Sequence, residues 1–200
     1  MASPIEFFIE FSSPYSFLAA RKIEDLGQKV GREIEWKPFL LGAVFKVSGG
    51  KPILSLPMKG DYSAHDLKRV ARRDGIDIGL PDPFPFSSVA IARAFYAEAA
   101  HDVASAKQLA LRLQEAVFVE RKDLGPADNV LEVAKEAGFD SQRLAAGMSD
   151  EAIKNKLKDT TNDAIERGVF GAPFFFVDVE PFWGQDRMED MALWIEKGGW

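Results

Sequence analysis

The repeat of hydrophobic and polar residues changes from two residues to a helical spacing, and back again, within the first 39 residues of the chain. Residues 5–11 and 33–39 alternate apolar with polar side chains, a pattern that predicts β-strands, whereas residues 16–30 follow a helical period. A right-handed crossover through that helix would make the two strands parallel. Residues 40–60 are rich in glycine, proline and serine and predict a long irregular loop, a kind of segment that is often functional in compact domains.

The remainder of the chain is mainly helical and then returns to strands. The pattern predicts helices over residues 63–73, 88–100, 104–121, 127–137 and 150–167, then a strand over 174–177, a short partner strand over 181–183 and a final helix over 187–197. The order β-α-β, helices, β-β-α predicts an α/β fold in which a thioredoxin-like domain is interrupted by an all-helical insertion domain. We expect the thioredoxin-like domain to comprise residues 1–48 and 150–200, and the helical insertion to comprise residues 49–149.

A four-residue motif, Ser13-Pro14-Tyr15-Ser16, lies where the first strand gives way to the first helix. It has the spacing of a Cys-x-x-Cys redox motif, with a hydroxyl in place of each thiol. A hydroxyl in the first turn of a helix lies beside free backbone N–H groups, which favour a bound anion such as a thiolate. Because the 200 residues include no cysteine, thiol chemistry here would need a thiol supplied by a second molecule. An ordinary N-cap serine followed by proline is the alternative interpretation of Ser13.

Charge, hydropathy and motif spacing argue against several classes of function. A net charge of −6 opposes a general nucleic-acid role, and no apolar run approaches the ~20 residues needed to span a membrane. The N-terminus lacks the basic and apolar regions of a signal peptide, so a cytoplasmic location is expected. His65 and His101 have no spacing for metal ligation, and no metal is expected. Neither Ser13 nor Ser16 lies in a Gly-x-Ser-x-Gly motif, which disfavours a serine hydrolase.

Three separated motifs resemble one known family. They are Phe-Ser-Ser-Pro-Tyr-Ser-Phe-Leu-Ala at 11–19, Gly-Val-Phe-Gly-Ala-Pro at 168–173 and Phe-Trp-Gly-Gln-Asp-Arg-Met-Glu at 182–189. In this order they resemble the 2-hydroxychromene-2-carboxylate isomerase family, which is related to the kappa-class glutathione transferases and similar in fold to the disulfide oxidoreductase DsbA. The likeness extends over nearly the whole chain and implies a fold of the DsbA and kappa-class type.

The resemblance implies a glutathione site. Ser13 matches the family's catalytic serine, whose hydroxyl holds the glutathione sulfur as a thiolate. Ala172 matches the residue whose backbone pairs with the cysteinyl part of glutathione, and it precedes Pro173, where thioredoxin-like folds have a cis peptide. Gln185 and Asp186 match positions that bind the γ-glutamyl end in kappa enzymes. Asp186 could instead be only the cap of the last helix, and a trans peptide is the commoner state before a strand proline.

Further candidates lie elsewhere in the sequence. Lys59 resembles a kappa lysine that binds the glycyl carboxylate of glutathione. Tyr15 and Lys37 are candidates for binding the second substrate, although a solvent-facing strand lysine is the more common role for a residue placed as Lys37 is. The kappa pattern has an asparagine where this chain has Gly50. Either a neighbouring residue or water replaces that side chain, or the second-substrate pocket differs.

The activity implied by the resemblance is a glutathione-dependent isomerisation. It would interconvert 2-hydroxychromene-2-carboxylate and trans-o-hydroxybenzylidenepyruvate through a thiolate adduct, in a pathway of aromatic compound degradation. The partners would be glutathione and a small aromatic carboxylate, and a homodimer is expected because relatives are commonly dimers. A kappa-like glutathione transferase or peroxidase would share the thiolate site and differ in the second pocket. A non-catalytic glutathione-binding module, or an interaction module that binds no glutathione, is a further alternative.

Overall fold

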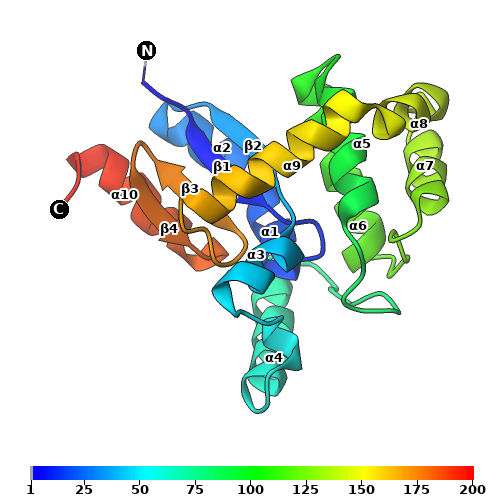
Figure 1. Cartoon of the computed structure of the whole chain (residues 1–200). Coiled ribbons are helices and arrows are strands. Elements are labelled where there is room, and N and C mark those ends of the chain that lie inside the picture. Colours follow the sequence, from blue (N-terminus) through cyan, green and yellow to red (C-terminus); the bar gives the residue numbers. More distant parts are fainter. Residues whose placement is uncertain (1) are drawn as a thin grey trace.

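The structure, a computed structural model, describes residues 2–200 and contains one four-stranded sheet (Figure 1). The strands are β1 (Ile5–Ile9), β2 (Ile34–Pro38), β3 (Phe174–Val177) and β4 (Glu180–Trp183). Their order across the sheet is β2-β1-β3-β4, with β1 parallel to β2 and antiparallel to β3, and β3 antiparallel to β4. The sheet confirms the predicted β-α-β beginning and β-β-α ending of the chain.

Helices surround this sheet on both faces and at one side. The described residues form the α-helices α1 (Pro14–Ala20), α2 (Ile23–Val30), α3 (Leu41–Ser48), α4 (Lys59–Arg73), α5 (Val89–Ala99), α6 (Val103–Phe118), α7 (Ala127–Glu136), α8 (Ser141–Ser149), α9 (Glu151–Glu166) and α10 (Met188–Lys197). Two short 3₁₀ helices, η1 (Ile53–Ser55) and η2 (Gln185–Arg187), precede α4 and α10.

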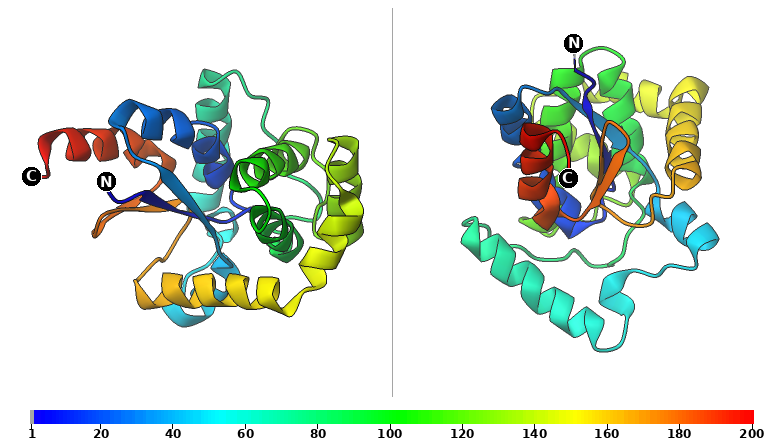
Figure 2. Two further views of the ribbon diagram at one scale, coloured as in Figure 1. Left: turned by 90° about the horizontal axis from the view of Figure 1, so that it is seen from above. Right: turned by 90° about the vertical axis from the view of Figure 1, so that its left-hand side faces the viewer.

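The side chains of β1 alternate between two apolar layers. Phe7 stacks on Phe175 with ring centroids 5.1 Å apart and meets Trp36 edge-on at 5.2 Å, in a layer covered by α1, α2 and α10. Phe8 points to the other layer, which α3 and α9 cover. Figure 2 shows α9 along one side of the sheet and α2 with α10 along the other. Burial on both faces fixes the C-terminal end of β1, from which the chain turns into α1.

A helical layer packs beside the sheet, with α5 at its centre in contact with α6, α8 and α9. The Tyr96 hydroxyl of α5 donates a hydrogen bond to the Pro38 carbonyl at 2.8 Å and lies 3.0 Å from Thr160 Oγ1. These contacts join α5 to the end of β2 and to α9. The α4 helix projects away from this layer (Figures 1 and 2). The division into domains at residues 48/49 and 149/150 stays a prediction.

The helix expected over residues 16–30 is broken into two. Lys22 has φ of −125° and ψ of −15°, outside the helical range, and separates α1 from α2. The break lets α1 pack on α6 while α2 packs against β2 and α10. Tertiary packing on two different partners therefore overrides a local pattern that favours one continuous helix.

Two α-helices occur where the sequence predicts none. The sequence predicts an irregular loop over residues 40–60, but the first part of this segment forms α3, because Val44 is buried in the Phe8 layer. Gly49 ends α3 in the left-handed region at φ of 73°. The α8 helix was also missed, although Asp140 is a strong N-cap whose carboxylate accepts from the backbone of Gln142 and Arg143.

Candidate active site

Ser13 lies at the N-terminal cap of α1, with Pro14 as the first helical residue. The backbone N–H of Ser13 donates to the Glu10 carbonyl at 3.1 Å, and the N–H of Ser16 donates to Ser13 Oγ at 3.2 Å. The proline suits this position because its ring presets φ and it has no N–H that would need a partner. These contacts fix the partly exposed Ser13 hydroxyl just beyond the C-terminal end of β1.

The hydroxyl of Ser13 meets the start of β3 from the other half of the chain. Ser13 Oγ donates to the Ala172 carbonyl at 3.0 Å, and the peptide bond between Ala172 and Pro173 is cis, as the sequence predicts. A Cβ at Gly171 would lie 2.4 Å from Trp183 Nε1, so glycine allows β4 to lie close to this loop. The structure thus brings together Ser13 and Ala172, which are 159 positions apart in the sequence.

The segment that carries Gln185 and Asp186 lies beside the same loop. The N–H of Gly184 donates to the Pro173 carbonyl at 3.0 Å, and η2, which follows, contacts α1. Gln185 is partly buried, whereas the Asp186 carboxylate is exposed and lies 3.2 Å from the Arg187 guanidinium. Both side chains therefore come from an element that adjoins α1 and the cis proline.

The α4 helix also contacts α1. The Tyr15 hydroxyl lies 3.0 Å from Asp66 Oδ2 and 3.3 Å from the Ser63 carbonyl, so it joins the two helices. Burial, and then the hydrogen bond to Asp66, raise the pKa of Tyr15, which stays neutral. Lys59 is the first residue of α4, about one helical turn or ~6 Å along the axis from Ser63. Its ammonium is exposed and forms no salt bridge with any of residues 2–200.

Lys37 lies in a different environment. Its ammonium pairs with Glu6, lies 3.7 Å from Asp163 and 3.9 Å from Glu35, and sits over the Phe8 ring at 5.3 Å from the centroid. This is the face of the sheet that α9 covers, whereas α1 packs on the opposite face. The structure does not bring Lys37 to Ser13, and its contacts are those of a partly buried ion-pair network.

Sequence reasoning missed Glu10, which directly adjoins the site. The alternating pattern predicts that Glu10 is one of the exposed polar residues of a strand, yet its side chain is buried. Glu10 Oε2 accepts from Ser12 N at 2.9 Å and from Ser12 Oγ at 2.6 Å, and the Ser88 hydroxyl donates to Oε1. Burial raises the pKa of the Glu10 carboxyl, and the hydrogen bonds from Ser12 and Ser88 act in the opposite direction. Its position three residues before Ser13 was the available signal.

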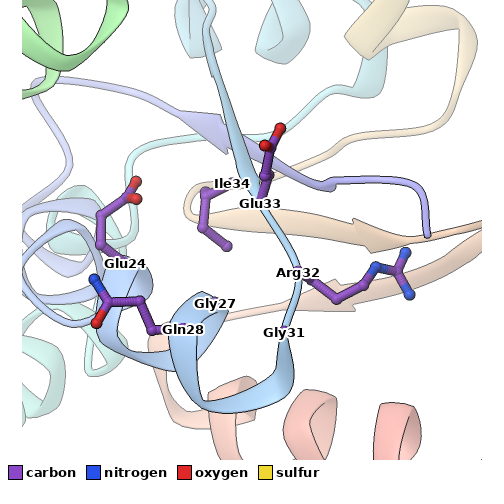
Figure 3. A pocket seen from close by; sticks show the side chains of 7 residues that line it. All are labelled: Glu24, Gly27, Gln28, Gly31, Arg32, Glu33 and Ile34. Atoms are coloured by element: carbon purple, nitrogen blue, oxygen red, sulfur yellow. The ribbon is translucent and has the colours of Figure 1, made fainter. Parts of the chain in front are cut away.

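Two surface hollows lie away from Ser13. One, of about 310 Å³, is formed where α2 meets the start of β2, and Figure 3 shows the side chains around it: Glu24, Gly27, Gln28, Gly31, Arg32, Glu33 and Ile34. Ile34 pairs with Ile5 at the beginning of β1, whereas Ser13 follows its end, so this hollow lies at the other end of the sheet. The second, of about 430 Å³, lies between α5, α7 and α8.

Within residues 2–200, no three His, Asp or Glu side chains are grouped so that they could hold a metal ion. In that same part of the chain, no helix combines the length and the apolar character that crossing a membrane requires.

Comparison with known proteins identifies the family. The family model described as DSBA-like thioredoxin domain matches residues 4–196. The chain belongs to this family. It is 30% identical to a 2-hydroxychromene-2-carboxylate isomerase of Pseudomonas putida, over 92% of this chain and 90% of that protein. It is 28% identical to glutathione S-transferase kappa 1 of Homo sapiens, over 94% of this chain and 88% of that protein.

A solved structure supports the same assignment. That of a 2-hydroxychromene-2-carboxylate isomerase superposes with a TM-score of 0.85 at 28% identity, covering 96% of this chain and 94% of the other. The resemblance stated from the three sequence motifs is therefore confirmed. The predicted DsbA-like thioredoxin fold with helices inserted between its two halves is confirmed as well.

Proposed function

We propose that the protein is a glutathione-dependent isomerase that interconverts 2-hydroxychromene-2-carboxylate and trans-o-hydroxybenzylidenepyruvate. The observation that carries the proposal is the pairing of Ser13 Oγ with the Ala172 carbonyl beside a cis proline, in a DSBA-like chain that has no cysteine. Such a site has a hydroxyl and backbone groups ready for a sulfur ligand but has no sulfur of its own. The isomerases and kappa transferases among its relatives support glutathione as the thiol and isomerisation as the reaction class.

Residues beside Ser13 and on the adjoining α4 helix fit the functional groups of glutathione. The Ala172 carbonyl can accept from a peptide N–H once the Ser13 hydroxyl turns to the sulfur, since one O–H cannot donate fully to both acceptors. Asp186 is exposed, and its carboxylate suits the α-ammonium group of the γ-glutamyl end, with Gln185 next to it. The free ammonium of Lys59 suits the glycyl carboxylate.

When bound, glutathione would supply a thiolate that adds reversibly to an electrophilic carbon of the chromene, which allows ring opening and rotation about a former double bond. Ser13 would donate its hydroxyl proton as a hydrogen bond to the sulfur and so stabilise the anion. Because α1 is only seven residues long, this stabilisation depends on the hydroxyl rather than on a long helix dipole. The buried walls that α1 and β3 provide would keep water from the sulfur.

A kappa-like glutathione transferase or peroxidase is the second candidate. The 28% identity to the human kappa enzyme is similar to the identity to the isomerases, and both would use the same thiolate site. They would differ in the second-substrate pocket, and the kappa pattern has an asparagine near its ligand where this chain has Gly50. A small aromatic carboxylate as second substrate, a homodimeric assembly and a cytoplasmic location belong to the isomerase proposal and stay predictions.

The ultraviolet-monitored interconversion of the two isomers tests the proposal. Protein dialysed free of small molecules is assayed with and without reduced glutathione. We expect fast turnover that requires glutathione and is lost in Ser13→Ala. Turnover with halogenated aromatics or hydroperoxides but not with the chromene would favour the transferase. Glutathione binding without any turnover would favour a binding module, and no binding at all would overturn the glutathione site.

A further inference from the structure

Glu10 is a buried carboxyl for which the proposed reaction has no role. It is 4% exposed, and its two oxygens meet three donors: the N–H and hydroxyl of Ser12, and the hydroxyl of Ser88. None of the lysines or arginines of residues 2–200 forms a salt bridge with it. Burying a carboxyl without a cation beside it costs free energy of folding, so the presence of Glu10 next to the candidate site needs an explanation.

The contacts of Glu10 converge on the turn that carries Ser13. Its carbonyl accepts from the Ser13 N–H at 3.1 Å, while its side chain holds Ser12. Main chain and side chain of one residue therefore fix the whole turn from residue 10 to residue 13. Through Ser88, which immediately precedes α5, the same carboxyl connects this turn to the helical layer.

We propose that Glu10 is a positioning residue for Ser13. The Glu10 carboxyl holds the Ser12–Ser13 turn and connects it to the start of α5. The group at position 13 thereby faces a bound sulfur and keeps the hydrogen bond from Ser16. The part that concerns glutathione rests on the proposed function. The effect on position 13 does not, because it can be measured on a thiol placed there.

The chain offers an unusually clean reporter for this effect. Since it has no cysteine, Ser13→Cys introduces a single thiol, whose pKa follows from its thiolate absorbance against pH without any glutathione. The thiolate would accept the Ser16 N–H that Ser13 Oγ now accepts. Loosening the turn removes that hydrogen bond and should raise the pKa of the introduced thiol.

Two substitutions at Glu10 separate hydrogen bonding from charge, because both are neutral. In Glu10→Gln the amide oxygen can still accept from Ser12 and the amide nitrogen can donate to the Ser88 oxygen. In Glu10→Met the volume is kept and all three hydrogen bonds are lost. In the Ser13→Cys background, we expect the thiol pKa to be about one unit higher with Glu10→Met than with Glu10→Gln.

Glu98→Met is the matched control. Glu98 is 3% exposed and accepts from Ser105 Oγ at 2.7 Å and from Arg143 at 2.6 Å, at the far end of α5 from Ser88. We expect this variant to lose stability without moving the thiol pKa. Equal thiol pKa values in Glu10→Met and Glu10→Gln, or an equal rise in Glu98→Met, would overturn the positioning role.

Ser88→Ala decides the question if Glu10→Met does not fold. It removes only the hydrogen bond between the turn and the helical layer, and we expect a smaller rise in the thiol pKa, equivalent to a roughly twofold fall in the acid dissociation constant. No rise would overturn the proposal. The outcome is independent of the isomerase assay: a chain that fails to bind glutathione but shows these shifts would refute the proposed function and retain the role of Glu10.

Discussion

Removing the Ser13 hydroxyl is the sharpest test of the candidate site. In the structure this hydroxyl donates to the Ala172 carbonyl at 3.0 Å and accepts from Ser16 N at 3.2 Å. In the complex its proton would instead be donated to the glutathione sulfur. Ser13→Ala removes that donor but keeps the turn, because the N–H of residue 13 still donates to the Glu10 carbonyl. We therefore expect the variant to bind glutathione mainly as the neutral thiol.

The size of the effect follows from one charge-assisted hydrogen bond. Such a bond contributes about 1.5–3 kcal/mol, which corresponds to about 1–2 pKa units. If the hydroxyl lowers the thiol pKa from about 8.5 to about 7, roughly half of the bound glutathione is thiolate at pH 7, against roughly 3% without it. Turnover at pH 7 should then fall more than tenfold. Loss of the N-cap costs about 1 kcal/mol, so Ser13→Ala should remain folded.

The thiolate absorbance of bound glutathione, titrated against pH, measures this prediction. Asp140→Ala is the control, since Asp140 caps α8 through the N–H groups of Gln142 and Arg143 at 3.1 and 3.0 Å. It should lose comparable stability and keep the original thiol pKa. An unchanged titration in Ser13→Ala would remove Ser13 from the proposed role. Equal shifts in both variants would show that helix stability, not the hydroxyl, sets the thiol pKa.

Three further predictions concern neighbouring groups. Lys59→Ala should weaken glutathione binding about tenfold, measured by calorimetry, without changing the thiol pKa, because it removes only a carboxylate partner. Ser16→Ala should leave the free energy of unfolding unchanged or raise it by up to about 1 kcal/mol, because the buried Ser16 hydroxyl has no partner among residues 2–200; a larger loss in urea unfolding would contradict this. Burial acts to raise the pKa of the Glu6 carboxyl, but hydrogen bonds and charges from Arg167 and Lys37 outweigh it and hold that pKa below 4.5. This depressed native pKa stabilises the fold above about pH 4.5, and the stabilisation is lost as pH falls through the native value; Glu6→Gln should flatten the decline of Tm in that window.

The sequence predicts the fold because several independent patterns agree. Two periods of alternation with a helix between them specify a parallel pair, and the late strand pair supplies the antiparallel side of the sheet. The same order of elements predicts the cis bond before Pro173, which no local property of the Ala-Pro dipeptide favours. The closeness of Ser13 and Ala172 follows from that topology, since β1 and β3 are neighbours.

Tertiary contacts explain what the sequence could not show. Lys22 interrupts a helical pattern because the two halves pack on different partners. The alternating pattern places Glu10 among the polar residues of a strand. It gives no indication that the hydroxyl of Ser88, 78 positions later, donates a hydrogen bond to the Glu10 carboxyl. Lys37 is paired with Phe8 across the sheet, so its side chain lies on the face that α9 covers. The position of Lys37 at a strand end does not by itself show on which face of the sheet the side chain lies.

Under the proposed function, the unequal environments of the two hydroxyls in the Ser-x-x-Ser motif and the absence of cysteine would favour reversible addition over disulfide exchange. Ser13 is partly exposed and its hydroxyl contacts the cis-proline loop, whereas Ser16 is fully buried. A thiol that enters can therefore reach only Ser13. This cysteine-free chain has no thiol of its own that could enter a thiol–disulfide exchange with the bound sulfur. A sulfur that is held as an anion but is never captured by an internal cysteine remains free to add to a substrate carbon and to leave again. Those two steps are what a thiol-catalysed isomerisation requires.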